Sequence, residues 1–131
     1  SYQSELATLP KTYQWSLEAN VSQLSKAVSQ AASYSLLSVG SGGSYTAAHF
    51  AASLHEHFFS RIAKSVTPLA LSQNKMLGEQ AVLLLSASGK NPDVLGAFNR
   101  AILSEPRRLI ILCFRRDSPL ARLAAKFDYV D

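Results

Sequence analysis

Hydrophobic positions along the chain form two alternating patterns. Short, continuous apolar runs predict strands, and between them apolar residues spaced three and four apart predict helices. The expected strands lie near residues 35–40, 65–71, 81–86, 108–114 and 128–131. Continuous apolar runs are typical of parallel strands that helices cover on both faces. The pattern therefore predicts a doubly wound α/β fold, a three-layer αβα sandwich with a five-stranded parallel sheet.

The first two helices are predicted from their apolar faces. Pro10 should break or start a helix, and an amphipathic helix is expected after it. Its apolar residues are Leu17, Val21, Leu24, Val28 and Ala31. A second helix is expected to follow the first strand, with Ser44 as its cap. Its apolar residues are Ala47, Phe50, Ala51, Leu54 and Phe58.

Prolines give the remaining boundaries. Asn91 and Pro92 predict a helix with asparagine as its cap and proline as its first residue, and Ser118–Pro119 predicts another. Because Pro68 cannot donate to a strand ladder, the strand at 65–71 is expected at an edge of the sheet.

Composition narrows the classes of protein. A chain of 131 residues, 47% of them hydrophobic and 17% charged, is expected to form one soluble domain over residues 1–131. It begins without methionine, so it is compatible with a fragment of a longer chain. The net charge of +4 is scattered and forms no basic stripe with aromatics, which argues against a nucleic-acid partner. No signal peptide or 18-residue apolar run appears, so no membrane contact and a cytoplasmic location are expected. The single cysteine, Cys113, is interpreted as a buried inert thiol.

Two loops rich in glycine and serine follow the first and third predicted strands. They read "GSGGSY" from Gly40 and "SASGKNPD" from Ser86, and each runs into a helix start. In open parallel sheets, ligands bind at the carboxyl ends of the strands. Hydroxyl groups, bare glycine backbone and helix N-termini there are typical of a phosphate site that needs no metal and no cofactor. The alternative is that the glycines only tighten the turns.

Two nucleotide-binding motifs are not satisfied. The dinucleotide fingerprint needs a third glycine three residues after its second, and Gly40 and Gly42 are followed by Tyr45 at that place. No Gly-Lys-Ser/Thr sequence occurs, which excludes a P-loop.

The two loops resemble those of a known family. "SVGSGGSYTAAHFAASL" and, some forty residues later, "LLLSASGKNPDVLGAFNRA" resemble the SIS domain, a phosphosugar isomerase and phosphosugar-binding module. The opening "ELATLPKTYQW" is similar to the helix before the first strand in glucosamine-6-phosphate synthase and related proteins. The resemblance covers essentially the whole chain. It implies a five-stranded parallel sheet in the order 2-1-3-4-5 and homodimers or tandem repeats.

The resemblance also implies a ligand site. The phosphate of a sugar phosphate would contact Ser86, Ser88 and Asn91, with Ser44 and the backbone of Gly43 on the other side. The most specific motif is S-x-S-G-x-x-x-D, here Ser86, Ser88, Gly89 and Asp93, in which Asp93 supports the helix start.

The sequence departs from the family pattern at positively charged residues. Lys90 stands where glutamate or another polar residue is common, and Arg115 and Arg116 replace a Thr-Asn pair. These side chains are possible extra contacts to a more anionic ligand, or ordinary surface charges.

The sequence leaves three functions open. Isomerisation needs a base, which in the family is a glutamate beyond the fifth strand and so beyond Asp131. The three histidines, His49, His55 and His57, lie on the second helix without metal-site spacing. We therefore expect a phosphosugar-binding module, acting as a sensor or as part of a larger protein. One alternative is an aldose-ketose phosphosugar isomerase or an aminosugar deaminase/isomerase whose catalytic glutamate lies outside this chain. The other is a dimerisation domain with an empty pocket. Self-association is expected from the apolar helix faces.

Overall fold

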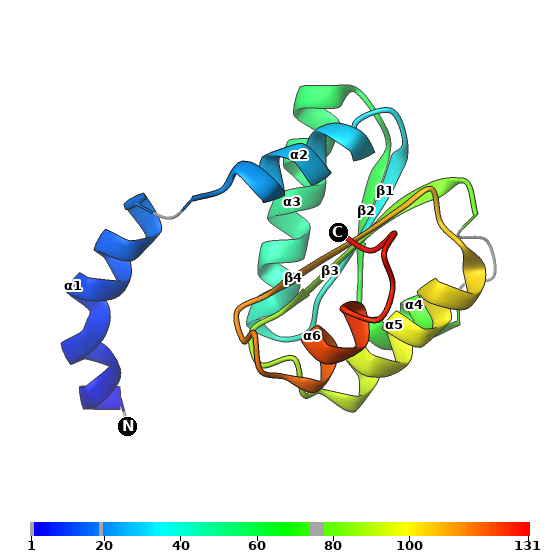
Figure 1. Ribbon diagram of the computed structural model, residues 1–131. Helices are drawn as coiled ribbons and strands as arrows, with labels where there is room; N and C mark the ends of the chain where they lie inside the picture. The colour runs from blue at the N-terminus through cyan, green and yellow to red at the C-terminus, as the bar shows by residue number, and fades with distance from the viewer. Residues whose placement is uncertain (1, 19, 74–77) are drawn as a thin grey trace.

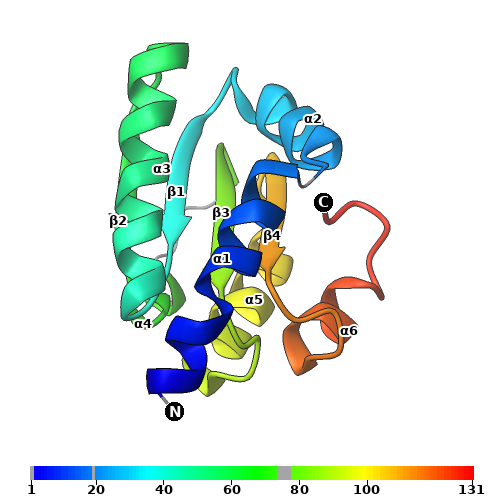
Figure 2. The ribbon, with the colours of Figure 1, turned by 90° about the vertical axis from the view of Figure 1, so that its left-hand side faces the viewer.

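The chain forms a three-layer α/β structure in which helices cover both faces of a parallel sheet (Figure 1). The computed structural model describes residues 2–18, 20–73 and 78–131. Four strands are hydrogen-bonded in the order β2-β1-β3-β4. They are β1 (Ser35–Val39), β2 (Ala63–Val66), β3 (Gln80–Ser86) and β4 (Arg108–Cys113). All three pairings are parallel, so the strands end at the same edge of the sheet (Figure 2).

A fifth strand is only begun beside β4. Val130 forms an isolated parallel bridge with Leu109. The Asp131 amide donates to the Leu109 carbonyl at 2.9 Å, and the Ile111 amide donates to the Asp131 carbonyl at 2.9 Å. The expected α/β class and the order 2-1-3-4 are confirmed, whereas the fifth strand at 128–131 is present only as this pairing.

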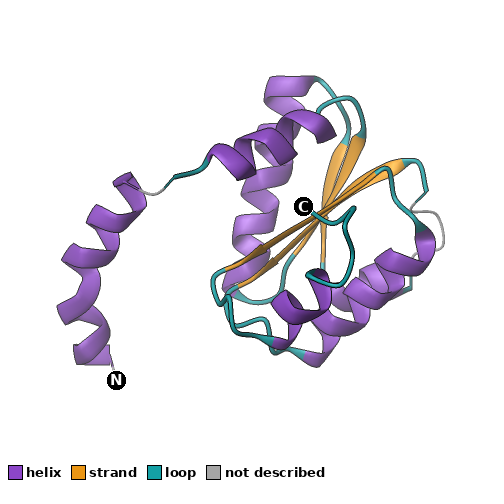
Figure 3. Cartoon of the chain, in the orientation of Figure 1, coloured by secondary structure: helices purple, strands orange, loops and turns teal. Residues whose placement is uncertain are grey.

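Two apolar cores lie on opposite faces of the sheet, and successive strand residues alternate between them. Leu37 and Val39 of β1 pack with α4 (Pro68–Ser72), α5 (Pro92–Ser104) and α6 (Pro119–Ala124). Leu36 faces the other core, which contains residues of α2 (Ser22–Ala31) and α3 (Gly43–Phe59). Figure 3 shows the two helical layers with the sheet between them. β3 is buried on both faces, and its apolar run is continuous, whereas the edge strand β2 is only partly buried and contains Lys64 and Ser65.

The N-terminal region forms two helices where one was expected. Helix α1 (Tyr2–Glu18) contains Pro10 in its interior, so the prediction that Pro10 breaks or starts a helix is wrong. α1 stands apart from the sheet (Figure 1), with Leu6 and Leu9 exposed. The chain turns before α2, where the Asn20 side chain accepts a hydrogen bond from the Ser22 amide at 2.9 Å.

The predicted strand at 65–71 is only half right. β2 ends at Val66, and Pro68 begins α4 instead of lying on an edge strand. The Thr67 side chain caps this helix by accepting from the Ala70 amide at 3.2 Å. The physical reason is local, because proline suits the first turn of a helix and cannot donate to a ladder.

Helix α3 turns a different face to the sheet from the one predicted. Its buried residues are Ala48, Ala52 and His55. Phe50 and Phe58 of the predicted face are 63% and 69% exposed. Small side chains allow the helix to lie close against β1 and β2, and Phe50 and Phe58 are left largely exposed. None of the described helices combines the length and the hydrophobicity needed to cross a membrane.

Candidate functional site

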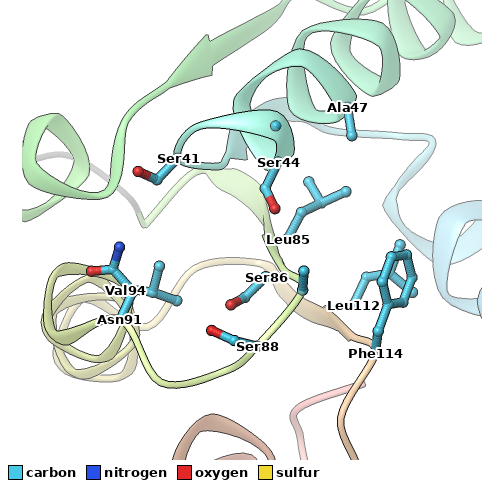
Figure 4. Close-up of a pocket in the computed structure, with 12 residues that line it drawn as sticks. Ser41, Ser44, Ala47, Leu85, Ser86, Ser88, Asn91, Val94, Leu112 and Phe114 are labelled. Atoms are coloured by element: carbon cyan, nitrogen blue, oxygen red, sulfur yellow. The ribbon is translucent and has the colours of Figure 1, made fainter. Parts of the chain in front are cut away.

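A cavity of about 400 Å³ opens at the carboxyl ends of the strands (Figure 4). It lies between the start of α3, the loop that follows β3, and the end of β4. Its lining residues are Ser41, Gly43, Ser44, Ala47, Leu85, Ser86, Ala87, Ser88, Asn91, Val94, Leu112 and Phe114. Five of the six predicted ligand-binding residues line this cavity, and Gly89 is the exception.

The β1–α3 turn forms one side of the cavity. Gly40 passes so close to the helix that a Cβ there would lie 2.1 Å from the Ser44 carbonyl oxygen. Gly42, not Ser44, is the N-cap residue of α3, so the predicted capping role of Ser44 is wrong. Ser44 lies in the first turn, and its hydroxyl points into the cavity (Figure 4). The turn therefore places a hydroxyl and the positive end of the helix dipole at the cavity.

The loop after β3 folds around its own serines. The Ser86 hydroxyl accepts a hydrogen bond from the Gly89 amide at 2.9 Å, and the Ser88 hydroxyl accepts from the Lys90 amide at 3.2 Å. Because each oxygen accepts from the backbone, each hydroxyl keeps its proton to donate elsewhere. Both oxygens point toward the cavity (Figure 4). The loop thus presents two hydroxyl donors.

Asn91 closes the loop and starts the next helix. Its Oδ1 accepts from the Asp93 amide at 2.8 Å, which confirms the predicted cap of α5. Since this contact fixes the oxygen, the side-chain amide nitrogen is the group that can donate toward the cavity (Figure 4). The Asp93 amide is itself occupied by this cap, and Pro92 has no amide hydrogen. Pro92 and Asp93 therefore have no free amide to offer a ligand, whereas the Asn91 side-chain amide is available.

Gly89 packs against the β4–α6 connection. Its φ is +67°, and a Cβ there would lie 2.4 Å from Ser118 Oγ and 2.9 Å from Cys113 Sγ. Its carbonyl accepts from the Leu120 amide at 3.0 Å. Ser118 is fully buried and caps α6 by accepting from the Ala121 amide. These contacts fix the serine loop to the β4–α6 connection.

The predicted extra cationic contacts do not line the cavity. Lys90 is exposed on the loop between Ser88 and Asn91. Arg115 and Arg116 lie along a separate hollow of about 350 Å³ beside Asp131. Cys113 also borders that hollow and is half-buried rather than buried, with Sγ 3.5 Å from Ser118 Oγ.

The histidines of α3 lie elsewhere. His49 Nδ1 is 3.1 Å from Ser65 Oγ at the edge strand, and buried His55 places Nε2 2.8 Å from the Tyr34 carbonyl oxygen. His57 is exposed and is in ring contact with Phe58. None of the three lines the cavity, and the described part of the chain holds no cluster of three metal-ligating side chains.

Sequence reasoning did not single out the apolar wall of the cavity. Leu112 belongs to β4, and Phe114 follows that strand directly. The only signal for them is position, because they stand at the carboxyl end of a predicted strand. Ser41 could have been predicted, because it belongs to the glycine- and serine-rich loop that starts at Gly40.

Solved structures share this arrangement of helices and strands. A Listeria monocytogenes protein described as a candidate sugar-phosphate isomerase matches with a TM-score of 0.69 and 21% identity, over 97% of this chain and 72% of that one. The tagatose-6-phosphate ketose/aldose isomerase of Escherichia coli matches with a TM-score of 0.65 and 18% identity, over 86% of this chain and 34% of that one. The c3406 protein of E. coli CFT073, in complex with arabinose 5-phosphate, matches with a TM-score of 0.69 and 16% identity, over 97% of this chain and 72% of that one.

The chain shares its fold with these proteins. At this level of identity the likeness is one of fold. The sequence matches no protein-family model and no curated protein. The chain spans about a third of the length of the tagatose-6-phosphate isomerase chain.

Proposed function

We propose that this domain binds a sugar phosphate, with the phosphate between the start of α3 and the loop from Ser86 to Asn91. One observation carries the proposal, namely that the Ser44, Ser86 and Ser88 hydroxyls and the Asn91 side chain converge on one cavity. The neighbours of the same fold support it, since one is a ketose/aldose phosphate isomerase and another is in complex with arabinose 5-phosphate. The resemblance of the serine loops to the SIS domain points the same way.

The donors of this cavity suit an anion. A phosphate oxygen can accept several hydrogen bonds, and the serine protons and the Asn91 amide are donors without a charge of their own. The N-terminus of α3 adds a favourable dipole. Lys90, exposed in the same loop, is proposed as a longer-range attraction for the anion.

Binding is a better-supported function than isomerisation. The lining residues, all of which the structure describes, include no carboxylate and no imidazole. Proton transfer between two sugar carbons needs such a base, which would have to come from outside the cavity. We therefore propose a binding module in the cytoplasm, acting as a sensor or as a part of a larger protein.

Ser88→Ala tests the phosphate site. A hydrogen bond to a charged group contributes about 1.5–3 kcal/mol, so we expect roughly tenfold to hundredfold weaker sugar-phosphate binding. Thermal shift against a panel of sugar phosphates selects the ligand, and calorimetric titration measures its affinity for both proteins. The free energy of unfolding should barely change, because Ser88 is exposed.

Ser53→Ala is the matched control. Ser53 is an exposed serine of α3 whose hydroxyl donates to the His49 carbonyl, away from the cavity. Its replacement should leave the affinity unchanged. Equal affinities for wild type and Ser88→Ala would exclude this loop as the phosphate site.

We also propose that the domain self-associates through the side of α3 that carries Phe50, Leu54 and Phe58. Leu54 and Phe58 border an apolar hollow of about 550 Å³ between α2, α3 and the sheet. Together with exposed Phe50 they make an apolar patch of a kind that usually marks an interface. Light scattering should show a dimer at micromolar concentration that Phe58→Glu converts to monomer. Leu103→Glu, at an equally exposed apolar site on α5, should leave the dimer intact. A wild-type monomer at high micromolar concentration would contradict the proposal.

A further inference from the structure

The cavity has two chemically different walls. In Figure 4, Asn91 lies toward one side with Val94 beside it, and Leu112 and Phe114 lie toward the other. The Ser44, Ser86 and Ser88 side chains lie between them, with Leu85 beside Ser44. A phosphate group uses only the polar wall. The volume of about 400 Å³ falls within the range of small-molecule pockets and leaves room for more than a phosphate. The apolar wall therefore faces the part of the ligand that carries no charge.

Phe114 holds a defined place beside the serine loop. It is the first residue after β4, and its backbone amide donates to the Ser86 carbonyl oxygen at 3.4 Å. The residue is therefore about one strand spacing, or ~4.8 Å, from the loop that would hold the phosphate. The phenyl ring rises along Leu112 on the apolar wall (Figure 4).

The exposure of Phe114 sets it apart from the core. It is 72% exposed, whereas Leu85 and Leu112 on the same wall are buried and half-buried. Among the exposed large hydrophobic residues of the described chain, Phe114 is the one that lines this cavity. A flat aromatic surface left in water at a pocket mouth gains favourable burial when a ligand covers it.

We propose that Phe114 is a specificity-determining residue that stacks on the ring of a cyclic hexose phosphate. This inference rests on the proposed phosphate site. A pyranose directs C–H groups to its faces and hydroxyls to its edge, so a ring face matches the flat apolar side of a phenyl group. An open-chain sugar or polyol phosphate has no rigid face to offer. The site therefore selects a ring form over an open-chain form of the sugar phosphate.

Phe114→Leu tests the stacking, because leucine keeps an apolar side chain and removes the flat ring. The ring-form probes are glucose 6-phosphate, galactose 6-phosphate and glucosamine 6-phosphate. Sorbitol 6-phosphate is the open-chain probe, and inorganic phosphate reports on the polar wall alone. We expect wild type to bind at least one ring-form probe about fivefold or more tighter than sorbitol 6-phosphate, and Phe114→Leu to abolish that preference. Affinities for sorbitol 6-phosphate and phosphate should change less than about twofold.

Leu103→Ala is the control, because Leu103 is a similarly exposed apolar residue but lies on α5 outside the cavity. Suppose that Ser88→Ala weakens the binding of every probe, so that the phosphate site stands. Equal wild-type affinities for ring-form and open-chain probes, or an unchanged preference in Phe114→Leu, would then overturn the stacking inference. If no probe binds, or Ser88→Ala has no effect, the proposed phosphate site fails and the inference fails with it.

Discussion

Replacing Gly40 with alanine is expected to destabilise the whole domain and abolish ligand binding. The new Cβ would lie 2.1 Å from the Ser44 carbonyl oxygen and 2.4 Å from its carbon, so the backbone of the first turn of α3 must move. Overpacking costs about 1–3 kcal/mol, and more when rigid backbone is displaced. We expect a loss of about 3 kcal/mol in the free energy of unfolding, measured by urea denaturation.

Gly96→Ala is the matched control for this loss. Gly96 lies in the interior of α5, and the nearest atom to a Cβ there is Ser72 Oγ at 4.0 Å. Alanine is the better helix former by up to about 1 kcal/mol, so this variant should be as stable as wild type or more stable. Equal destabilisation by the two substitutions would show that the close approach at Gly40 is not the cause.

Gly89→Ala is expected to displace the serine loop. A left-handed backbone costs a residue with a Cβ about 1–2 kcal/mol, and here the Cβ would also lie 2.4 Å from Ser118 Oγ. We expect a loss of about 2–4 kcal/mol in stability and at least a tenfold loss of sugar-phosphate affinity, since Ser86 depends on the Gly89 amide. Denaturation and titration of the same variant measure both quantities.

Gly43→Ala is the comparison for Gly89→Ala, because a Cβ on Gly43 would meet nothing within 4 Å. It should unfold like wild type. A Gly89→Ala protein that keeps both wild-type stability and wild-type affinity would show that the loop tolerates the change and that its contact with Ser118 does not position Ser86.

The fold was predictable from the sequence where the signals come from neighbouring residues, as at helix caps, or where a strand is almost completely buried. β3 and β4 are uninterrupted apolar runs, and the structure places them within one residue of the predicted ends. Asn91 caps α5 as predicted, and the predicted helix start at Ser118–Pro119 is found with Ser118 as its cap. These signals are local, because a capping side chain acts on amides two or three residues away. Thr67 before Pro68 is the same kind of helix-start signal, but the apolar residues after Pro68 led to the prediction of a strand.

Packing between elements was harder to predict. Hydrophobicity favoured Phe50, Leu54 and Phe58 as the buried side of α3, yet Ala48 and Ala52 lie against the sheet. A close approach of helix and sheet selects small side chains, and a hydrophobic pattern does not show how closely two elements pack. The two-helix N-terminal region was missed for a related reason, since the expected apolar spacing continues across the break before α2.

The polar half of the candidate site was predictable because parallel topology brings the ends of neighbouring strands together. β1 and β3 are adjacent, so Ser44 and the loop from Ser86 to Asn91 meet at one cavity. The apolar half of the site was not predictable, because Leu112 and Phe114 belong to no sequence motif. The placement of Arg115 and Arg116 along another hollow also depends on how the chain turns after β4.

The most direct test of the phosphate site is a crystal structure of the protein with the sugar phosphate that binds most tightly in titration. We predict phosphate oxygens within hydrogen-bonding distance of Ser86 Oγ, Ser88 Oγ and the Asn91 side-chain amide, with the Ser44 hydroxyl facing them across the cavity. A phosphate bound instead in the hollow beside Arg115 and Arg116, with the serine loop empty, would contradict the account.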